Sequence, residues 1–162
     1  DERAFFHLRQ TGFWGEPRLF RVFVGTDEII FVEAATGKEV PDMEEALRSE
    51  SLDDFDKRIC RRVLDLNELP LDELLESIES SFVWSTGKIT DASIDPPAAK
   101  PAVGSRRSAV LQLVHKSKGT VAFDLPTDSD VESALSILRD PFEDILQVHV
   151  RWDKASKRFV KQ

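Results

Sequence analysis

Short apolar runs that suit β-strands stand in pairs in both halves of the chain. Leu19–Val24 and Ile29–Val32 are rich in β-branched and aromatic residues, and the turn-forming residues 25–28 lie between them. Residues 109–114 and 120–125 form a second such pair around the turn 115–119, with side chains expected to alternate between two faces. The pattern therefore predicts two hairpins, one early and one late in the chain.

Four further segments have strand patterns, and a fifth is ambiguous. Ser81–Trp84 and Lys88–Ile94 are predicted to be a pair of short strands, whereas residues 4–10 suit either a strand or a short helix. Leu146–Trp152 alternates most regularly and predicts one half-buried strand, against which residues 157–160 are expected to pair.

Between the hairpins the apolar period changes to that of amphipathic helices. Met43–Glu50, Asp53–Leu66 and residues 71–78 are predicted to be helices that each present one apolar face. Residues 41–80 contain thirteen acidic and five basic residues, which accounts for the whole net charge of −8. An acidic surface disfavours nucleic acid and anionic lipid and suits a basic partner, but a solvated helix face is the simpler interpretation of this insert.

A helix with its own start and stop signals is predicted at about residues 127–139. Thr127 is expected to cap it, with Asp130 as the acid of a capping box, and Asp140-Pro141 ends it. Its apolar stripe is formed by Val131, Ala134, Leu135 and Leu138. Burying that stripe stabilises the helix more than the cap does, so we expect the helix to lie on the sheet.

Length and composition indicate a single domain, residues 1–162. The chain is 41% hydrophobic and 32% charged, which is typical of a globular protein, and no apolar run is long enough to span a membrane. Residues 95–105 contain three prolines and are expected to form a loop. The chain starts without Met, so a signal peptide or other domains removed from its N-terminus remain possible.

The order of the predicted elements resembles a known family. The early hairpin 21–31, the strands 81–84 and 88–92, and the segment 111–125 that leads into the helix 128–138 are similar to bacterial pleckstrin-homology-like (PH-like) domains. This resemblance implies an α+β fold with a small, strongly bent antiparallel sheet, a partial barrel, whose open end is covered by the helix. The insert 41–80 and the strand after the helix depart from that pattern, which leaves a generic α+β sandwich as the alternative fold.

Local motifs for catalysis are absent from the sequence, which has no Gly-rich phosphate loop, no paired cysteines, no His-Glu-x-x-His and no Gly-x-Ser-x-Gly. Cys60 is the only cysteine, and a structural, half-buried thiol is expected. His7, His115 and His149 are isolated in sequence and are expected to be surface or half-buried residues of a sheet. We therefore expect no enzymatic activity, cofactor or metal, although a catalytic site assembled by folding needs no local motif.

Basic residues gather in one region that contains no acid. Residues 100–120 include Lys100, Arg106, Arg107, Lys116 and Lys118. The hairpin separates the loop before it from its turn, so these charges need not form one patch. The resemblance implies that basic loops at the open end bind phosphorylated lipids or acidic peptides. Arg106, Arg107, Lys116 and Lys118 are therefore the candidate anion- or ligand-binding residues, with simple solvation of the loops as the alternative.

These observations favour a non-catalytic interaction module whose partner is an unidentified protein rather than nucleic acid. A lone cysteine is compatible with the reducing cytosol, so a cytoplasmic location is expected. One alternative is a binder of a small ligand or phosphorylated headgroup through the basic loops, and another is an enzyme whose acid/base site assembles on folding. A homodimer formed through the amphipathic insert is also open.

Overall fold

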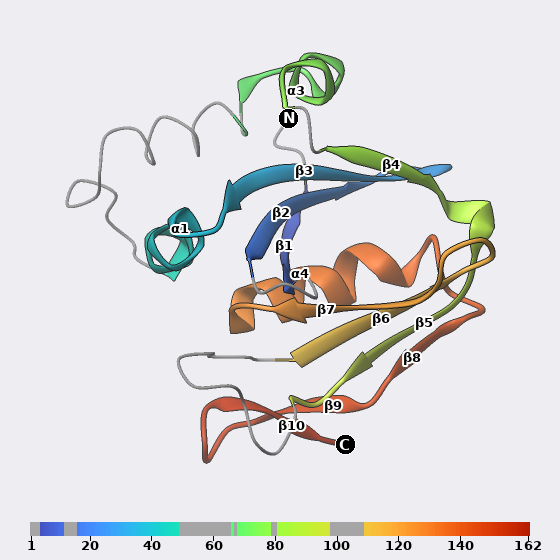
Figure 1. Cartoon of the computed structure of the whole chain (residues 1–162). Helices are drawn as coiled ribbons and strands as arrows, with labels where there is room; N and C mark the ends of the chain where they lie inside the picture. Colours follow the sequence, from blue (N-terminus) through green and yellow to red (C-terminus); the bar gives the residue numbers. More distant parts are fainter. Residues whose placement is uncertain (1–3, 12–15, 49–65, 67, 79–80, 98–108) are drawn as a thin grey trace.

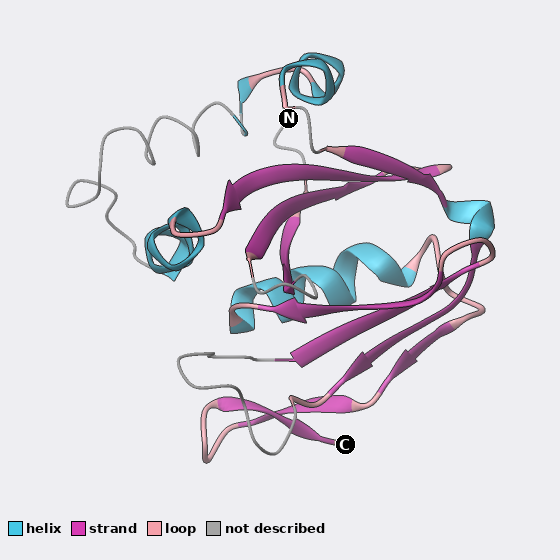
Figure 2. Cartoon of the chain, viewed as in Figure 1, coloured by secondary structure: helices cyan, strands magenta, loops and turns pink. Residues whose placement is uncertain are grey.

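The computed structural model describes residues 4–11, 16–48, 66, 68–78, 81–97 and 109–162 (Figure 1). Its strands are β1 (Phe6–Thr11), β2 (Pro17–Val24), β3 (Glu28–Thr36), β4 (Phe82–Ser85), β5 (Ile89–Asp95), β6 (Ala109–His115), β7 (Gly119–Leu125), β8 (Leu146–Val148), β9 (Val150–Asp153) and β10 (Arg158–Lys161). The helices are α1 (Glu39–Arg48), α3 (Leu71–Ser77), α4 (Asp128–Arg139) and the short 3₁₀ helix η1 (Thr86–Lys88). Figure 2 shows how these helices and strands are distributed.

Eight strands form one sheet in the order β4-β3-β2-β1-β7-β6-β5-β8, and β9 and β10 form a separate two-stranded sheet. Neighbouring strands of the large sheet are antiparallel, except that β8 pairs with β5 in parallel from Ala92↔Leu146 to Ile94↔Val148. The predicted α+β class is confirmed. The sheet is not wholly antiparallel, however, and it is not closed into a barrel.

Contacts between distant strands show that the sheet bends strongly. Two strands separate β3 from β7, yet the ring centroids of Phe31 and Phe123 are 5.7 Å apart. Four strands separate β4 from β6, yet the rings of Trp84 and His115 are 5.1 Å apart. Figure 1 shows the result, in which β2, β3 and β4 form one layer and β5, β6 and β7 form another.

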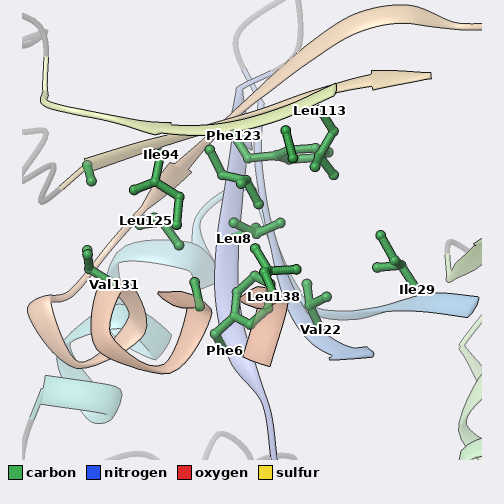
Figure 3. Packing of buried hydrophobic residues seen from close by; sticks show 14 of the residues in the cluster. Phe6, Leu8, Val22, Ile29, Ile94, Leu113, Phe123, Leu125, Val131 and Leu138 are labelled. Atoms are coloured by element: carbon green, nitrogen blue, oxygen red, sulfur yellow. The ribbon is translucent and has the colours of Figure 1, made fainter. Parts of the chain in front are cut away.

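The main hydrophobic core fills the inside of this bend and includes one face of α4. Phe6 and Leu8 of β1 pack in the same cluster as Val131, Ala134 and Leu138 of the helix (Figure 3). Each large side chain buried there contributes about 1.5–3 kcal/mol, so the helix is held mainly by packing, as predicted. The predicted cap is also present. The backbone N–H of Asp130 donates to the Thr127 hydroxyl at 3.1 Å, and α4 starts at Asp128.

The opposite face of β2 and β3 carries a second, smaller core that includes residues of α1 and α3. Phe23 and Val32 of the sheet belong to the same cluster as Met43 of α1 and Leu74 of α3. Part of the predicted acidic insert therefore buries its apolar face against the chain's own sheet. Helix α1 begins four residues before the predicted start, and α3 agrees with the predicted helix. The predicted helix Asp53–Leu66, apart from Leu66, lies outside the described residues, as does Cys60.

Two predicted strand arrangements are wrong. The strands β4 and β5 do not pair with each other, because η1 leads the chain from the β4 edge across the opening to β5, which pairs with β6 and β8. The expected single strand 146–152 is broken at His149, whose N–H donates to the Ile94 carbonyl at 2.8 Å. Beyond it β9 pairs with β10, which confirms the expected partner segment, and Trp152 is 40% exposed.

The ambiguous N-terminal segment is strand β1, in the middle of the sheet. No helix within the described ranges is both long and apolar enough to cross a membrane.

Candidate functional site

Three turns meet at one end of the bent sheet, and together they form what we call the rim: residues 25–28 between β2 and β3, η1, and residues 115–119 between β6 and β7. The Thr86 N–H donates to the Asp27 carbonyl at 2.9 Å, and the Thr86 hydroxyl donates to the Thr26 carbonyl at 3.3 Å. On the other side of η1, the Lys116 N–H donates to the Lys88 carbonyl at 2.9 Å. These bonds hold the two hairpin turns in place on either side of η1.

A pocket of about 630 Å³ opens at the rim. It is lined by Asp27, Glu28, Val83, Trp84, Ser85, Lys88, His115, Ser117 and Lys118. Val83, Trp84 and Ser85 belong to β4, an edge strand that pairs only with β3 among the described strands. The turn that contributes Ser117 and Lys118 forms the other wall. The pocket therefore lies between the edge strand β4 and the β6–β7 turn, next to the β2–β3 turn.

The structure separates the four basic residues predicted to bind a ligand. Lys118 lines the pocket, together with Lys88, which the sequence did not single out. Lys116 lies in the same turn as Lys118 but does not line the pocket. Arg106 and Arg107 lie outside the described residues. The prediction therefore stays untested as a whole, and Lys118 is the member that the described part places at a concave surface.

His115 contributes a hydrogen-bond donor to the pocket wall. Its Nδ1 accepts from the backbone N–H groups of Ser117 at 3.1 Å and Lys118 at 3.3 Å, so a neutral ring must carry its proton on Nε2. Burial is the largest cause that lowers the pKa of His115 below its usual value, and the charges of Lys118 and Lys88 lower it further. No described residue is bonded to Nε2, so this N–H remains available on a ring that lines the pocket.

The charges around the pocket come from different elements. The cations Lys88 and Lys118 belong to η1 and the β6–β7 turn, whereas Asp27 and Glu28 belong to the β2–β3 turn and the start of β3. All four side chains are exposed. Within the described segments none of them forms an ion pair with another. The pocket wall therefore carries groups that attract anions and groups that attract cations.

A second polar group of residues lies inside the protein, where β1 and β7 diverge. The two strands are paired only at Arg9↔Asp124, and α4 begins beyond that point. The Asp130 carboxylate takes the place of a strand partner: its Oδ1 accepts from the His7 backbone N–H at 2.9 Å and from His7 Nδ1 at 2.8 Å. The Thr127 hydroxyl donates to Oδ2 at 2.6 Å. Asp130 thus joins the start of α4 to the middle of the sheet.

The neighbouring arginine determines the protonation of His7. Arg21 Nε donates to His7 Nε2 at 3.0 Å, and because arginine is only a donor, His7 must carry its proton on Nδ1. The Arg21 guanidinium also lies 4.0 Å from the centre of the Phe5 ring, and its side chain is almost completely buried. Both ring nitrogens of His7 are therefore used inside the protein.

Burial and hydrogen bonding act in opposite directions on this network. Burial is the largest cause that lowers the pKa of His7; the hydrogen bond and charge of Asp130 oppose it, and the charge of Arg21 reinforces it. For Asp130, burial alone would raise the pKa, but the contacts with His7 and the hydrogen bond from Thr127 hold it below its usual value. The network is thus a neutral histidine between a carboxylate and a guanidinium.

The expectation that the histidines are surface or half-buried is wrong for His7 and His115, which are both buried. His149 is exposed and pairs with Asp95 at 2.6 Å. Sequence reasoning also missed the role of Arg21, although a lone charge within the apolar run Leu19–Val24 is a signal of a buried polar contact.

Comparison with known proteins gives no family model that matches this chain and no curated protein with a matching sequence. No group of three or more His, Cys, Asp and Glu side chains suited to a metal ion occurs in the part of the chain that the structure describes. The rim pocket is therefore the candidate site.

Proposed function

We propose that this protein is a non-catalytic interaction module on a PH-like scaffold that binds an extended segment of a partner protein at the rim. The observation that carries this proposal is that three residues of β4, an edge strand, line the rim pocket. An extended segment that adds to this edge gains main-chain hydrogen bonds from β4, and its side chains enter the pocket.

The exposed surface of β4 supports the same proposal. Val83 is 40% exposed and is one of only two large hydrophobic residues with an exposed side chain in the described segments. Trp84, the next residue of the strand, points to the opposite face, and its ring packs against His115 across the bend. An exposed valine on an edge strand suits an apolar side chain of a partner.

The state of the buried histidines favours binding over catalysis. A histidine that acts as a general base needs an unprotonated nitrogen directed at the substrate. The unprotonated nitrogen of His115 accepts from its own turn, and that of His7 accepts from Arg21. Both rings therefore use their basic nitrogen within the fold.

The PH-like part of the proposal rests on the sheet and on α4. The antiparallel strands β1–β7 form a strongly bent sheet, and α4, which follows β7, packs inside the bend. A bent antiparallel sheet with a helix after β7 supports the PH-like part of the proposal. The parallel strand β8 and the hairpin β9–β10 are additions to it.

Selection of a random library of nine-residue peptides displayed on phage, with the whole chain as bait, tests the proposed function. We expect enriched peptides that bind the wild-type chain and bind Val83→Asp at least tenfold more weakly, because a carboxylate on the β4 edge repels main-chain carbonyls and removes the apolar contact. Thermal unfolding of the variant checks that it is folded. No enrichment, or equal binding to the folded variant, would contradict the proposal.

A phosphorylated ligand bound through the basic turn is the second candidate, and Lys118 and Lys88 beside the His115 donor favour it. Titration with inorganic phosphate distinguishes the two candidates. Saturable phosphate binding that Lys118→Glu abolishes, in the absence of peptide enrichment, would support the second candidate instead.

A further inference from the structure

The charges of the rim pocket specify what kind of segment it holds, provided that the proposed function is correct. A partner segment in this pocket meets Lys88, Lys118 and the ring of His115, whose Nε2–H has no partner among the described residues. It also faces Asp27 and Glu28, which line the same pocket. The geometry points to a dipolar occupant: an extended peptide with a carboxylate side chain directed at the two lysines and His115, and a cationic side chain directed at the two acids.

The donor side is built for an oxygen acceptor. The two backbone N–H groups that bond Nδ1 fix the plane of the His115 ring, and the Trp84 ring packs against it at 5.1 Å. The Nε2–H is therefore oriented by the protein before any ligand arrives, which lowers the entropy cost of binding. A carboxylate accepts this hydrogen bond and neutralises the lysines, whereas an amide or hydroxyl does only the first.

The acidic residues of the pocket explain why the occupant should also carry a positive charge. An occupant that is only anionic gains from Lys88 and Lys118 but is opposed by Asp27 and Glu28. An occupant with both signs of charge can pair with both kinds of group, because the cations and the acids belong to different elements. Charge complementarity of this kind sets specificity and orientation more than total affinity.

The turn of the hairpin offers a matched pair of variants. Lys116→Glu and Lys118→Glu change the net charge equally and lie two residues apart, but only Lys118 lines the pocket. The proposal predicts that the enriched peptides contain an acidic and a basic residue. It also predicts that Lys118→Glu weakens a synthetic enriched peptide about tenfold while Lys116→Glu changes its affinity less than twofold, as measured by isothermal titration calorimetry.

Two substitutions of His115 separate its two nitrogens. In His115→Asn the amide oxygen can replace Nδ1 as the acceptor for the turn, but the Nε2–H is lost. In His115→Gln the amide N–H can replace the Nε2–H. We expect His115→Asn to weaken the peptide about tenfold with little change in the melting temperature, and His115→Gln to retain more of the affinity.

The outcomes separate the two proposals. Peptides that lose affinity for Val83→Asp but carry no acidic residue, or that bind Lys118→Glu and Lys116→Glu equally well, would overturn the dipolar occupant and leave the binding module intact. Peptides that bind Val83→Asp as well as they bind the wild-type chain, or no enrichment at all, would overturn both.

Discussion

His7 and His115 are both buried histidines on strands of one bent sheet, yet they differ in how many ring nitrogens form hydrogen bonds within the protein. His7 donates to Asp130 and accepts from Arg21, so the fold satisfies both nitrogens. His115 accepts from its own turn and keeps an N–H on a pocket wall. A polar side chain whose hydrogen-bonding groups are all satisfied within the protein holds elements together. A side chain that keeps an unbonded N–H at a concave surface can bind a ligand. The first region should therefore govern stability, and the second should govern binding.

The largest expected effect concerns the network around His7. Asp130→Ala leaves the backbone N–H and the Nδ1–H of His7 buried without their acceptor, so we expect a loss of about 2–5 kcal/mol in the free energy of unfolding. Urea denaturation at pH 7.5 measures it. Asp128→Asn, in the same turn of α4, is the matched control and should cost less than about 1 kcal/mol. Equal effects of the two variants would show that the network does not hold the fold.

The pH dependence of stability tests the protonation of His7. Because the pKa of His7 is lower in the folded than in the unfolded chain, the unfolded chain binds the extra proton as the pH falls below about 6.5. Stability should therefore decline from that pH downwards, with a slope of at most about 1.4 kcal/mol per pH unit for this one group. The lowered pKa of Asp130 adds a further loss below its unfolded value of 3.8.

Urea midpoints measured from pH 7.5 to pH 5 give this profile. His7→Asn, whose amide can donate to Asp130 but does not titrate, should have a flatter profile than the wild-type chain. A profile as steep as that of the wild type would mean that another group causes the acid loss. His115 also has a lowered pKa, so His115→Asn is the comparison variant.

A smaller effect is expected at the helix cap. Thr127→Ala removes both the acceptor for the Asp130 N–H and the donor to the Asp130 carboxylate, and it should cost about 1–2 kcal/mol. Thr127→Ser retains the hydroxyl and should restore most of that stability. Thermal unfolding of the wild-type chain and the two variants measures these differences. An alanine variant as stable as the serine variant would contradict the role of the hydroxyl.

The smallest effect on stability is expected at the rim. Lys118→Glu changes an exposed residue that forms no ion pair within the described chain, so its free energy of unfolding should stay within about 0.5 kcal/mol of the wild-type value. The same variant should weaken peptide binding about tenfold. A strongly destabilised Lys118→Glu would remove the distinction between the two regions.

The local signals in the sequence predicted most of the individual elements but not the site. Thr127 and Asp130 correctly indicated the start of α4, because a capping box is visible within four residues. The main contact of Asp130, however, is with His7, which lies 123 positions away in the sequence. No local pattern encodes a contact of that range.

The same limit explains the rim. The turn 115–119 was predicted, whereas Lys88 was assigned to a strand and lies in η1, and the meeting of both with β4 depends on the bend of the sheet. The alternation of apolar and polar residues predicts which side chains of a strand share a face, but it does not predict the curvature of the complete sheet. Lys118 was consequently grouped with Lys116, Arg106 and Arg107 by charge alone, whereas the structure groups it with His115 and Lys88.

The central distinction, that the fold uses both nitrogens of His7 but only one of His115, is tested most directly by the imidazole ¹⁵N spectrum of the folded chain. The protein has three histidines, so assignment through His→Gln variants is practicable. At pH 7.5 we expect His7 to carry its proton on Nδ1 and His115 to carry its proton on Nε2. A His115 proton on Nδ1, or a positively charged ring at either position, would contradict the account.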